Sequence, residues 1–273
     1  MLGATVPAVG GYHMAFQQGD KWQCQCIQIY ITPSRRWKVP DLSQTEIVKF
    51  KQAWKKSNIK KVVAHVPYLV NLASNNQILW KKSIKRLEIE LSRANKLGVS
   101  FLILHPGSYG TSTKPKGIKR IILALNQVLR NYTGKTMILL ETMAGQGTMI
   151  GSKFEEIALI LKTIKRSKSI GVCLDTGHIF MSGYDIRDSQ GYKKILTKFD
   201  QIIGLKKIKA IHLNDSKADC GSIIDRHASI GKGKIGLKTF QLLIKDKRFK
   251  NIPKLLELKE EETIESLKLL QKK

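Results

Sequence analysis

The chain alternates short apolar runs with amphipathic stretches, and eight such pairs along its 273 residues predict a TIM (β/α)8 barrel. Its composition is 42% hydrophobic, which suffices for one large core. Since no linker-like or low-complexity segment interrupts the alternation, we expect a single domain over residues 1–273. A doubly wound open sheet with helices on both faces is the alternative architecture.

The expected strands are short runs of β-branched and aliphatic residues. In chain order they are MLGATV (1–6), CIQIYIT (26–32), KKVVAHV (60–66), VSFLILHPG (99–107), TMILLETMAG (136–145), IGVCLDTGH (170–178), IKAIHLNDSK (208–217) and IPKLLELKE (252–260). Two of the amphipathic stretches between them are WKKSIKRLEIELSRANKLG (80–98) and KFEEIALILKTIKRS (153–167).

Residues 80–98 illustrate why these stretches are expected to be helices. Apolar residues recur at spacings of three and four, as in Ile84, Leu87 and Leu91. Lysines occupy the other face, as on a solvated helix surface, and Gly98 is placed to end the helix.

Residues of the types that bind metals stand at or just past the ends of six successive expected strands. They are His65, His105, Glu141, Asp175, His212 and Glu257. The 21 acidic residues and 6 histidines are a small fraction of the chain, so a chance match at six strand ends is rare. One such residue alone could be a helix cap or a buried polar group, but TIM barrels build active sites at this end of their strands. The set therefore indicates an active site.

Two loops add more of the same chemistry. DTGH places His178 three residues after Asp175, and DRH places Asp225 and His227 two residues apart. A mixed set of imidazoles and carboxylates without a thiolate suits Zn²⁺ or Mn²⁺ better than Ca²⁺ or Mg²⁺. Nine ligands are too many for one ion. Four-coordinate sites that leave room for water or substrate, with one bridging carboxylate, divide them among three metals.

The chain is strongly basic, with 48 Lys and Arg against 21 Asp and Glu and a net charge of +27. An excess of this size predicts attraction to a polyanion, of which nucleic acid is the obvious example. A general bias towards lysine is the alternative explanation. Several metals facing a basic surface favour phosphoryl chemistry, because two close ions can generate a hydroxide and clamp the attacking and leaving oxygens. We therefore expect phosphodiester hydrolysis.

Three ordered segments carry a resemblance to a known family. They are LETMAGQGTMIG (140–151), LDTGHIFMSGYDIR (174–187) and HLNDSKADCGSIIDRHASIGKGKIG (212–236). They resemble the endonuclease IV family of apurinic/apyrimidinic endonucleases, also called AP endonuclease family 2. These are zinc-dependent enzymes of base excision repair with a TIM-barrel fold, and the resemblance runs over nearly the whole chain.

The resemblance implies a division of the nine ligands among three Zn²⁺ ions, with Mn²⁺ a possible substitute. His65, His105 and Glu141 would hold the first ion. Glu141 would bridge to a second ion, which Asp175, His212 and Glu257 would also hold. His178, Asp225 and His227 would hold the third.

The resemblance also implies a reaction. A hydroxide between the first two metals, oriented by Glu257, attacks the phosphorus 5′ to an abasic sugar, and the third zinc stabilises the departing 3′ oxygen. The products are a 3′ hydroxyl and a 5′ deoxyribose phosphate. Glu257 and the bridging Glu141 would therefore be the catalytic residues.

In this family, side chains inserted into the base stack recognise the damage. The matching residues are Tyr68 and Leu69 in HVPYLVN (65–71) and Arg35 in SRRWK (34–38). For Tyr68 the alternative is a buried aromatic ring at the barrel mouth. The implied partner is double-stranded DNA that contains abasic sites, and we expect a monomer.

Four positions depart from the family pattern. Thr5 stands where histidine is usual, so any supporting role there is expected to be lost. Gly177 and Ala228 replace larger residues beside ligands, and Lys232 stands where an acidic residue is usual. The nine ligands themselves are all present.

Two other functions would explain part of the pattern. A sugar isomerase or epimerase on the same barrel uses carboxylates and histidines around one or two metals, but has no use for His178, Asp225 and His227 as a third site. A non-enzymatic DNA-binding protein would explain the charge, but not the ligands at six strand ends.

The chain shows no secretory leader and no uncharged apolar run long enough to cross a bilayer. We therefore expect no membrane association and a cytoplasmic protein of bacterial type, with a nuclear or viral setting open. Four cysteines are too few to staple a chain of this size, and we interpret Cys24 and Cys26 as ordinary thiols, with a redox pair as the alternative.

Overall fold

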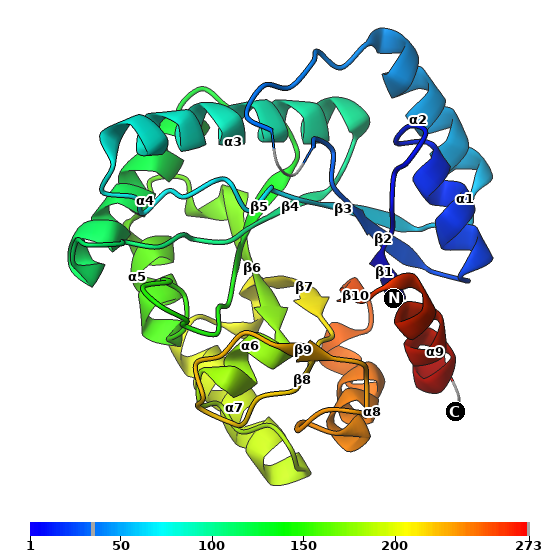
Figure 1. Ribbon diagram of the computed structural model, residues 1–273, viewed down its shortest axis with the longest axis vertical. Coiled ribbons are helices and arrows are strands. Elements are labelled where there is room, and N and C mark those ends of the chain that lie inside the picture. The colour runs from blue at the N-terminus through cyan, green and yellow to red at the C-terminus, as the bar shows by residue number, and fades with distance from the viewer. Residues whose placement is uncertain (34–35, 272–273) are drawn as a thin grey trace.

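Parallel strands of the described chain close into an eight-stranded barrel, in the order β1-β10-β7-β6-β5-β4-β3-β2 (Figure 1). The computed structural model describes residues 1–33 and 36–271. The barrel strands are β1 (Leu2–Thr5), β2 (Cys26–Ile29), β3 (Lys61–His65), β4 (Phe101–Leu104), β5 (Met137–Glu141), β6 (Ile170–Asp175), β7 (Ile208–His212) and β10 (Lys254–Leu256). Because β1 pairs with both β2 and β10, the sheet has no open edge. The predicted TIM barrel is confirmed, and the open sheet is wrong.

Helices surround the barrel and follow its strands along the chain (Figure 1). They are α1 (Met14–Lys21), α2 (Gln44–Lys56), α3 (Gln77–Leu97), α4 (Lys114–Leu129), α5 (Phe154–Thr163), α6 (Thr176–Met181), α7 (Ser189–Ile202), α8 (Leu237–Lys245) and α9 (Glu260–Gln271). Helix α3 begins earlier than expected, because the Asn76 side chain accepts the Leu79 N–H and caps it. It ends before Gly98, whose φ of 79° suits glycine, as expected.

The barrel interior contains a buried apolar layer with one residue from each of seven strands. Its members are Cys26, Val63, Ile103, Leu139, Cys173, Ala210 and Leu255. A larger apolar core lies between the strands and the helices. Since alternate residues of a strand face the same side, the next inward position on each strand lies two residues further along, towards the C-terminal mouth. The interior layer is therefore the floor of the functional site.

Two local features differ from the sequence expectation. The expected strand 170–178 stops at Asp175, because the Asp175 side chain accepts the His178 N–H at 2.7 Å and starts α6. The connection after β7 forms a small antiparallel ribbon of β8 (Asp215–Ser216) and β9 (His227–Ala228), which lies beside α6 in Figure 1. Both features shape the loops that carry ligand-type residues.

Buried charges on α3 hold the connection between β2 and α2. Arg86, which is 1% exposed, donates to Glu90 Oε1 at 2.7 Å and to the Trp37 carbonyl at 3.2 Å. Arg93 donates to the carbonyls of Ile31 at 3.1 Å and of Pro40 at 2.7 Å. A buried guanidinium is tolerated when its N–H groups are satisfied in this way. These bonds fix the described residues of the connection at the barrel mouth.

Burial suppresses the reactivity of Cys24 and Cys26. Burial is the main cause that raises the pKa of both thiols to about 12. Since the thiolate is the reactive form, neither residue is activated for redox chemistry, in agreement with the expectation of ordinary thiols.

The close approach of β1 to β2 generates a prediction for Gly3. A Cβ atom at this position would lie 1.6 Å from the Cys26 carbonyl oxygen, so Gly3→Ala must force the two strands apart. We expect the free energy of unfolding to fall by at least about 3 kcal/mol. The control Gly98→Ala meets no atom within 4 Å and suffers only from its φ of 79°, at a cost of about 1–2 kcal/mol. Denaturant unfolding measures both. Equal costs would contradict the strand contact.

Candidate metal centre

Six of the nine ligand-type side chains form one layer with Thr5 and Gln28 at the C-terminal mouth of the barrel. The layer consists of Thr5, Gln28, His65, His105, Glu141, Asp175, His212 and Glu257. Seven of these residues lie two positions beyond a member of the apolar interior layer, and Thr5 lies two positions beyond Gly3. The pleat of the strands therefore directs all eight side chains towards the barrel axis.

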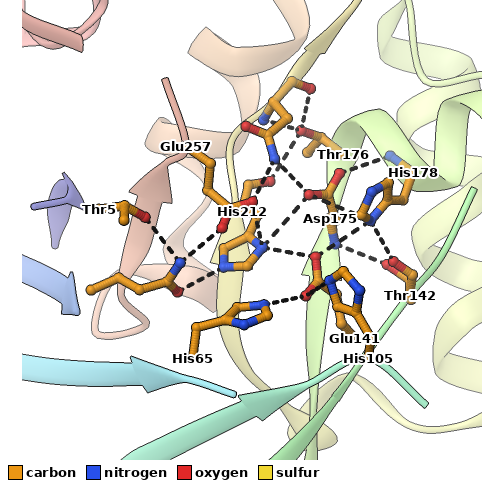
Figure 2. A network of polar contacts seen from close by, with 12 residues as sticks. Thr5, His65, His105, Glu141, Thr142, Asp175, Thr176, His178, His212 and Glu257 are labelled. Carbon is orange, nitrogen blue, oxygen red and sulfur yellow. Dashed lines mark hydrogen bonds and ion pairs between the residues drawn. The ribbon is translucent and has the colours of Figure 1, made fainter. Parts of the chain in front are cut away.

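The carboxylate of Glu141 lies at the middle of this layer and contacts four imidazoles (Figure 2). Its Oε2 is 3.1 Å from His65 Nε2 and 3.2 Å from His105 Nε2. Its Oε1 is 2.9 Å from His212 Nδ1 and 3.3 Å from His178 Nδ1. Glu141 is fully buried. One oxygen therefore faces His65 and His105 and the other faces His212 and His178, so this carboxylate lies between different sets of imidazoles, as a bridging carboxylate does.

Three groups of potential ligand atoms, each within 4.8 Å of one another, lie around Glu141. They are His65, His105 and Glu141; then Glu141, Asp175, His212 and Glu257; and then Asp175, His178 and His227. The first two match the expected sets. In the second, His212 Nδ1 lies 3.2 Å from Glu257 Oε2 and 3.6 Å from Asp175 Oδ2.

Asp225, the remaining predicted ligand, joins the third group through both of its oxygens. Asp225 Oδ2 is 3.3 Å from His178 Nε2, and Asp225 Oδ1 is 3.1 Å from His227 Nε2. Both Nε2 atoms are buried, yet among the described residues neither has a hydrogen-bond partner. Two buried imidazole nitrogens aimed at one carboxylate without hydrogen bonds fit a metal ion, which would take their lone pairs.

Hydrogen bonds at the far ring atoms set which nitrogen of each histidine is available. His65 Nδ1 lies 2.7 Å from the Val66 carbonyl, and His178 Nδ1 lies 2.8 Å from the Thr142 carbonyl. An N–H that donates to a carbonyl leaves the other nitrogen with its lone pair towards the centre. In both residues that nitrogen is Nε2, the atom that faces a carboxylate.

The buried acidic and basic groups of the centre shift one another's pKa values. Burial alone would raise the pKa of the Glu141 carboxyl, but His212 and His105 hold it well below its usual range. Burial alone would lower the pKa of His178, but Asp175 and Asp225 raise it well above its usual value. The pKa of His212 is also raised well above its usual value, against the effect of burial. In the metal-free protein His178 and His212 therefore carry protons that balance the buried carboxylates.

Gln28 is a supporting residue that the sequence analysis missed. His212 Nε2 lies 2.9 Å from Gln28 Oε1, which accepts its N–H, and Gln28 Nε2 donates to Glu257 Oε1 at 2.8 Å and to Thr5 Oγ1 at 2.9 Å. The expectation that position 5 loses its supporting role is therefore wrong, because Thr5 helps to orient Gln28 (Figure 2). Asn214 acts similarly, since its Nδ2 donates to Asp175 Oδ2 at 2.6 Å and to Glu257 Oε2 at 3.1 Å.

Of the three residues expected to enter DNA, Tyr68 and Leu69 lie in the connection after β3, and Arg35 lies outside the described residues. Tyr68 is 66% exposed, so it is not the buried aromatic residue of the alternative interpretation. Its ring centre lies 5.2 Å from that of His105 and 5.9 Å from that of His65. Leu69 is half-buried beside it. Tyr68 therefore projects into solvent at the edge of the candidate centre.

The other departures from the family pattern also have structural counterparts. A Cβ atom on Gly177 would lie 3.2 Å from the Asn214 carbonyl oxygen, so the backbone of α6 packs closely against the Asn214 segment. Ala228 is buried in the β8–β9 ribbon. Lys232 pairs with Glu265 at 2.7 Å between exposed side chains. None of these contacts displaces one of the nine predicted ligands.

The fold and the site define the class of the protein, a TIM barrel with a candidate metal centre at its C-terminal mouth. Comparison with known proteins shows to which family of this class the chain belongs. A family model described as "Xylose isomerase-like TIM barrel" matches residues 16–273. A crystal structure of a D-tagatose 3-epimerase-like protein is similar in fold, with 17% identity, a TM-score of 0.74 and coverage of 98% of this chain and 96% of that one. Within the described residues, no helix is long and apolar enough to span a membrane.

More similar proteins identify the family. "Probable endonuclease 4" of Chloroflexus aurantiacus is 38% identical over 257 residues, which are 94% of this chain and 90% of the relative. The protein of the same name from Halothermothrix orenii is 40% identical over 256 residues, or 94% and 92%. The crystal structure of endonuclease IV from Thermus thermophilus superposes with a TM-score of 0.87 at 29% identity and covers 99% of this chain and 97% of that one. The chain belongs to the endonuclease IV family.

The raised histidine pKa values predict that the metal-free protein loses stability as the pH rises. His178 and His212 bind protons more tightly when folded, so their contribution is complete below the unfolded pKa of about 6.5 and is lost as the pH rises through the folded pKa. The lowered pKa of Glu141 contributes stability above about pH 4.3 and does not offset this loss. Thermal unfolding of chelator-treated protein should show a lower midpoint at about pH 8.5 than at about pH 6. A higher midpoint at the alkaline pH would contradict the protonated centre.

The contacts of Gln28 predict its effect on metal retention. Gln28→Leu removes the acceptor for His212 and the donor to Glu257, so the second group of ligands should lose metal about 10- to 100-fold more readily. Competition with a chelator measures this loss. The control Gln18→Leu removes only an exposed hydrogen bond to Glu260 and should leave retention unchanged. Equal retention in the two variants would show that Gln28 does not support the site.

Proposed function

We propose that this protein is a zinc-dependent DNA repair endonuclease, which hydrolyses the phosphodiester bond 5′ to an abasic site in duplex DNA. The products are a 3′ hydroxyl and a 5′ deoxyribose phosphate. The observation that carries the proposal is the convergence of nine imidazole and carboxylate ligands on three adjoining groups at the barrel mouth. Relatives that carry the name endonuclease 4 place the chain among DNA-cleaving hydrolases.

The donor set fits zinc. Five imidazoles and four carboxylates supply nitrogen and oxygen donors, and the nearest thiol, Cys173, lies in the apolar layer below. Glu141 would bridge the first two ions, and His178, Asp225 and His227 would hold the third. Bound zinc would supply Lewis acidity, which lowers the pKa of a water and neutralises charge on the phosphate. Because one chain supplies every ligand, we further propose that a monomer is active.

Glu257 is the carboxylate best placed to handle a proton. Gln28 fixes its Oε1 and Asn214 fixes its Oε2, so the side chain has one orientation. It is 16% exposed, whereas Glu141 is 1% exposed, and water therefore reaches Glu257 more easily. Its Oε2 can accept a hydrogen bond from a water that attacks a phosphate at the mouth.

In this proposal the basic surface would bind DNA, and the exposed edge of the site would recognise the damage. A net charge of +27 attracts the DNA phosphates without regard to sequence or damage. Tyr68, with Leu69 and Arg35, would enter the base stack where a base is already missing, because unstacking an intact step costs a few kcal/mol. Selectivity for the lesion would then come from this edge rather than from charge.

The rival function of a sugar epimerase has weaker support. The D-tagatose 3-epimerase-like protein shares the fold with this chain at 17% identity, and a likeness at that level shows the barrel alone. Proton transfer on a small sugar gives no role to the third group with His178 and His227 or to the charge of +27. The third group is therefore the feature that favours phosphodiester chemistry.

One assay tests the proposed function directly. The zinc-loaded protein is incubated with a duplex that carries a single abasic-site analogue, and with the same duplex without the lesion. We expect one incision 5′ to the lesion, with a 3′ hydroxyl that a DNA polymerase can extend. Incision of both duplexes alike, or of neither, would contradict the proposal.

Glu257→Gln should separate binding from cleavage. The amide keeps the size of the side chain but not the negative charge that orients a nucleophilic water, so we expect the cleavage rate to fall at least about 100-fold with DNA binding retained. Single-turnover cleavage and fluorescence anisotropy measure the two quantities. Glu155→Gln on α5, which removes an exposed ion pair with Lys198 of α7, is the control and should cleave normally. A Glu257→Gln protein that cleaves at the normal rate would assign this role to another residue.

A further inference from the structure

Two adjacent isoleucines project into solvent beside the third group of ligands. Ile223 is 51% exposed and Ile224 is 52% exposed, in the connection between β8 and β9. The next residue is Asp225, which reaches His178 and His227. Exposure of a large apolar side chain to water is unfavourable. An adjacent pair of such side chains at the edge of a polar centre therefore points to a binding role.

The backbone at Ile223 strengthens this argument. Its φ is 60°, a left-handed conformation that a β-branched residue adopts only under strain. The turn is held in place, because the Ile223 N–H donates to the Met181 carbonyl at 2.9 Å at the end of α6. A glycine could make the same bond without strain. Positioning of Asp225 therefore does not explain the isoleucine side chain, which destabilises the turn that carries it.

The surroundings of the pair match the chemistry of a DNA strand. Lys217 and Arg226 are exposed residues that pair through their backbones at the base of the turn, where the Lys217 N–H donates to the Arg226 carbonyl at 2.9 Å. The cations at the base of the turn suit the phosphates on the outside of a DNA strand. The apolar groups at its tip suit the faces of the sugars and bases.

The pair also lies across the mouth from Tyr68. In Figure 1 the β8–β9 ribbon lies on the far side of the barrel axis from β3, after which Tyr68 follows. The ligand groups fill the space between, from His105 beside Tyr68 to His178 beside Asp225. A strand whose phosphate lies at the centre would extend over both edges.

We propose that Ile223 and Ile224 form a second apolar contact with the DNA, against the sugar and base face of a nucleotide next to the scissile phosphate on the side of the third ligand group. This inference rests on the proposed function. The pair would supply apolar contact area, whereas the lysines supply attraction to phosphate.

A double variant, Ile223→Gly with Ile224→Ser, tests the contact in the zinc-loaded full chain. We expect kcat/KM on the abasic duplex to fall about tenfold, since the buried apolar area of an isoleucine is lost. The salt dependence of DNA binding and the zinc content should not change, because no charge or ligand is removed. The unfolding midpoint should stay the same or rise, because glycine relieves the strain at position 223. Leu159→Ser is the matched control, since Leu159 is 50% exposed on α5, and it should cleave normally.

Three outcomes would overturn the inference. If the double variant cleaves within about twofold of the unmodified protein, the isoleucines make no productive contact with DNA. If its activity falls together with its zinc content, the turn only positions Asp225. If the unmodified protein cuts neither duplex, the proposed function fails and the inference fails with it, which separates this case from the first two.

Discussion

The buried carboxylate of Glu141 is the group on which the rest of the site depends. It contacts imidazoles from four different segments: His65 at the end of β3, His105 after β4, His178 on α6 and His212 at the end of β7. A buried negative charge is costly unless cations or hydrogen-bond donors surround it. The barrel mouth must therefore supply positive charge around Glu141, either as protons on His178 and His212 or as metal ions. The imidazoles that stabilise the buried charge of Glu141 are therefore the same groups that are predicted to bind metal.

The sequence predicts the barrel well because two strong patterns agree. Apolar runs mark the strands and amphipathic stretches mark the helices, and ligand-type residues fall at the strand ends where barrel enzymes place their sites. The expected strand 170–178 ran past its true end, because Asp175 has a polar side chain that can either continue a strand or cap a helix. The β8–β9 ribbon was missed because two-residue strands leave no periodic signal.

The supporting residues were harder to predict, although the strand pleat contains the information. Gln28 lies two residues beyond Cys26, as His65 lies two beyond Val63, so the inward register of the barrel assigns Gln28 to the same layer as the ligands. Its amide does not match a metal-ligand pattern, and composition alone gave no reason to select it. Thr5 was misjudged in the same way, because a hydroxyl can replace an imidazole as a hydrogen-bond acceptor. Which ligands share an ion depends on side-chain directions across the barrel, which no spacing along the chain reveals.

The distribution of charge explains how a strongly basic chain can build an acidic centre. Of the predicted ligand carboxylates at the barrel mouth, Glu141 and Asp175 are fully buried, whereas exposed pairs such as Lys232–Glu265 are worth little in water. On the proposed DNA substrate, the outer lysines would act at a distance, and the apolar edges at Tyr68 and Ile223 would act only on contact. In the proposed function, charge would therefore govern how often DNA is bound, and the edges would govern which DNA stays long enough to be cut.

Metal analysis of the purified, active protein tests directly whether the barrel mouth holds three ions. Each chain supplies three groups of ligands that share Glu141 and Asp175. We expect three metal ions per chain, mostly zinc, with activity against the abasic duplex that is lost slowly in strong chelator and restored by zinc. Full activity in protein that holds a single metal ion per chain would contradict this expectation.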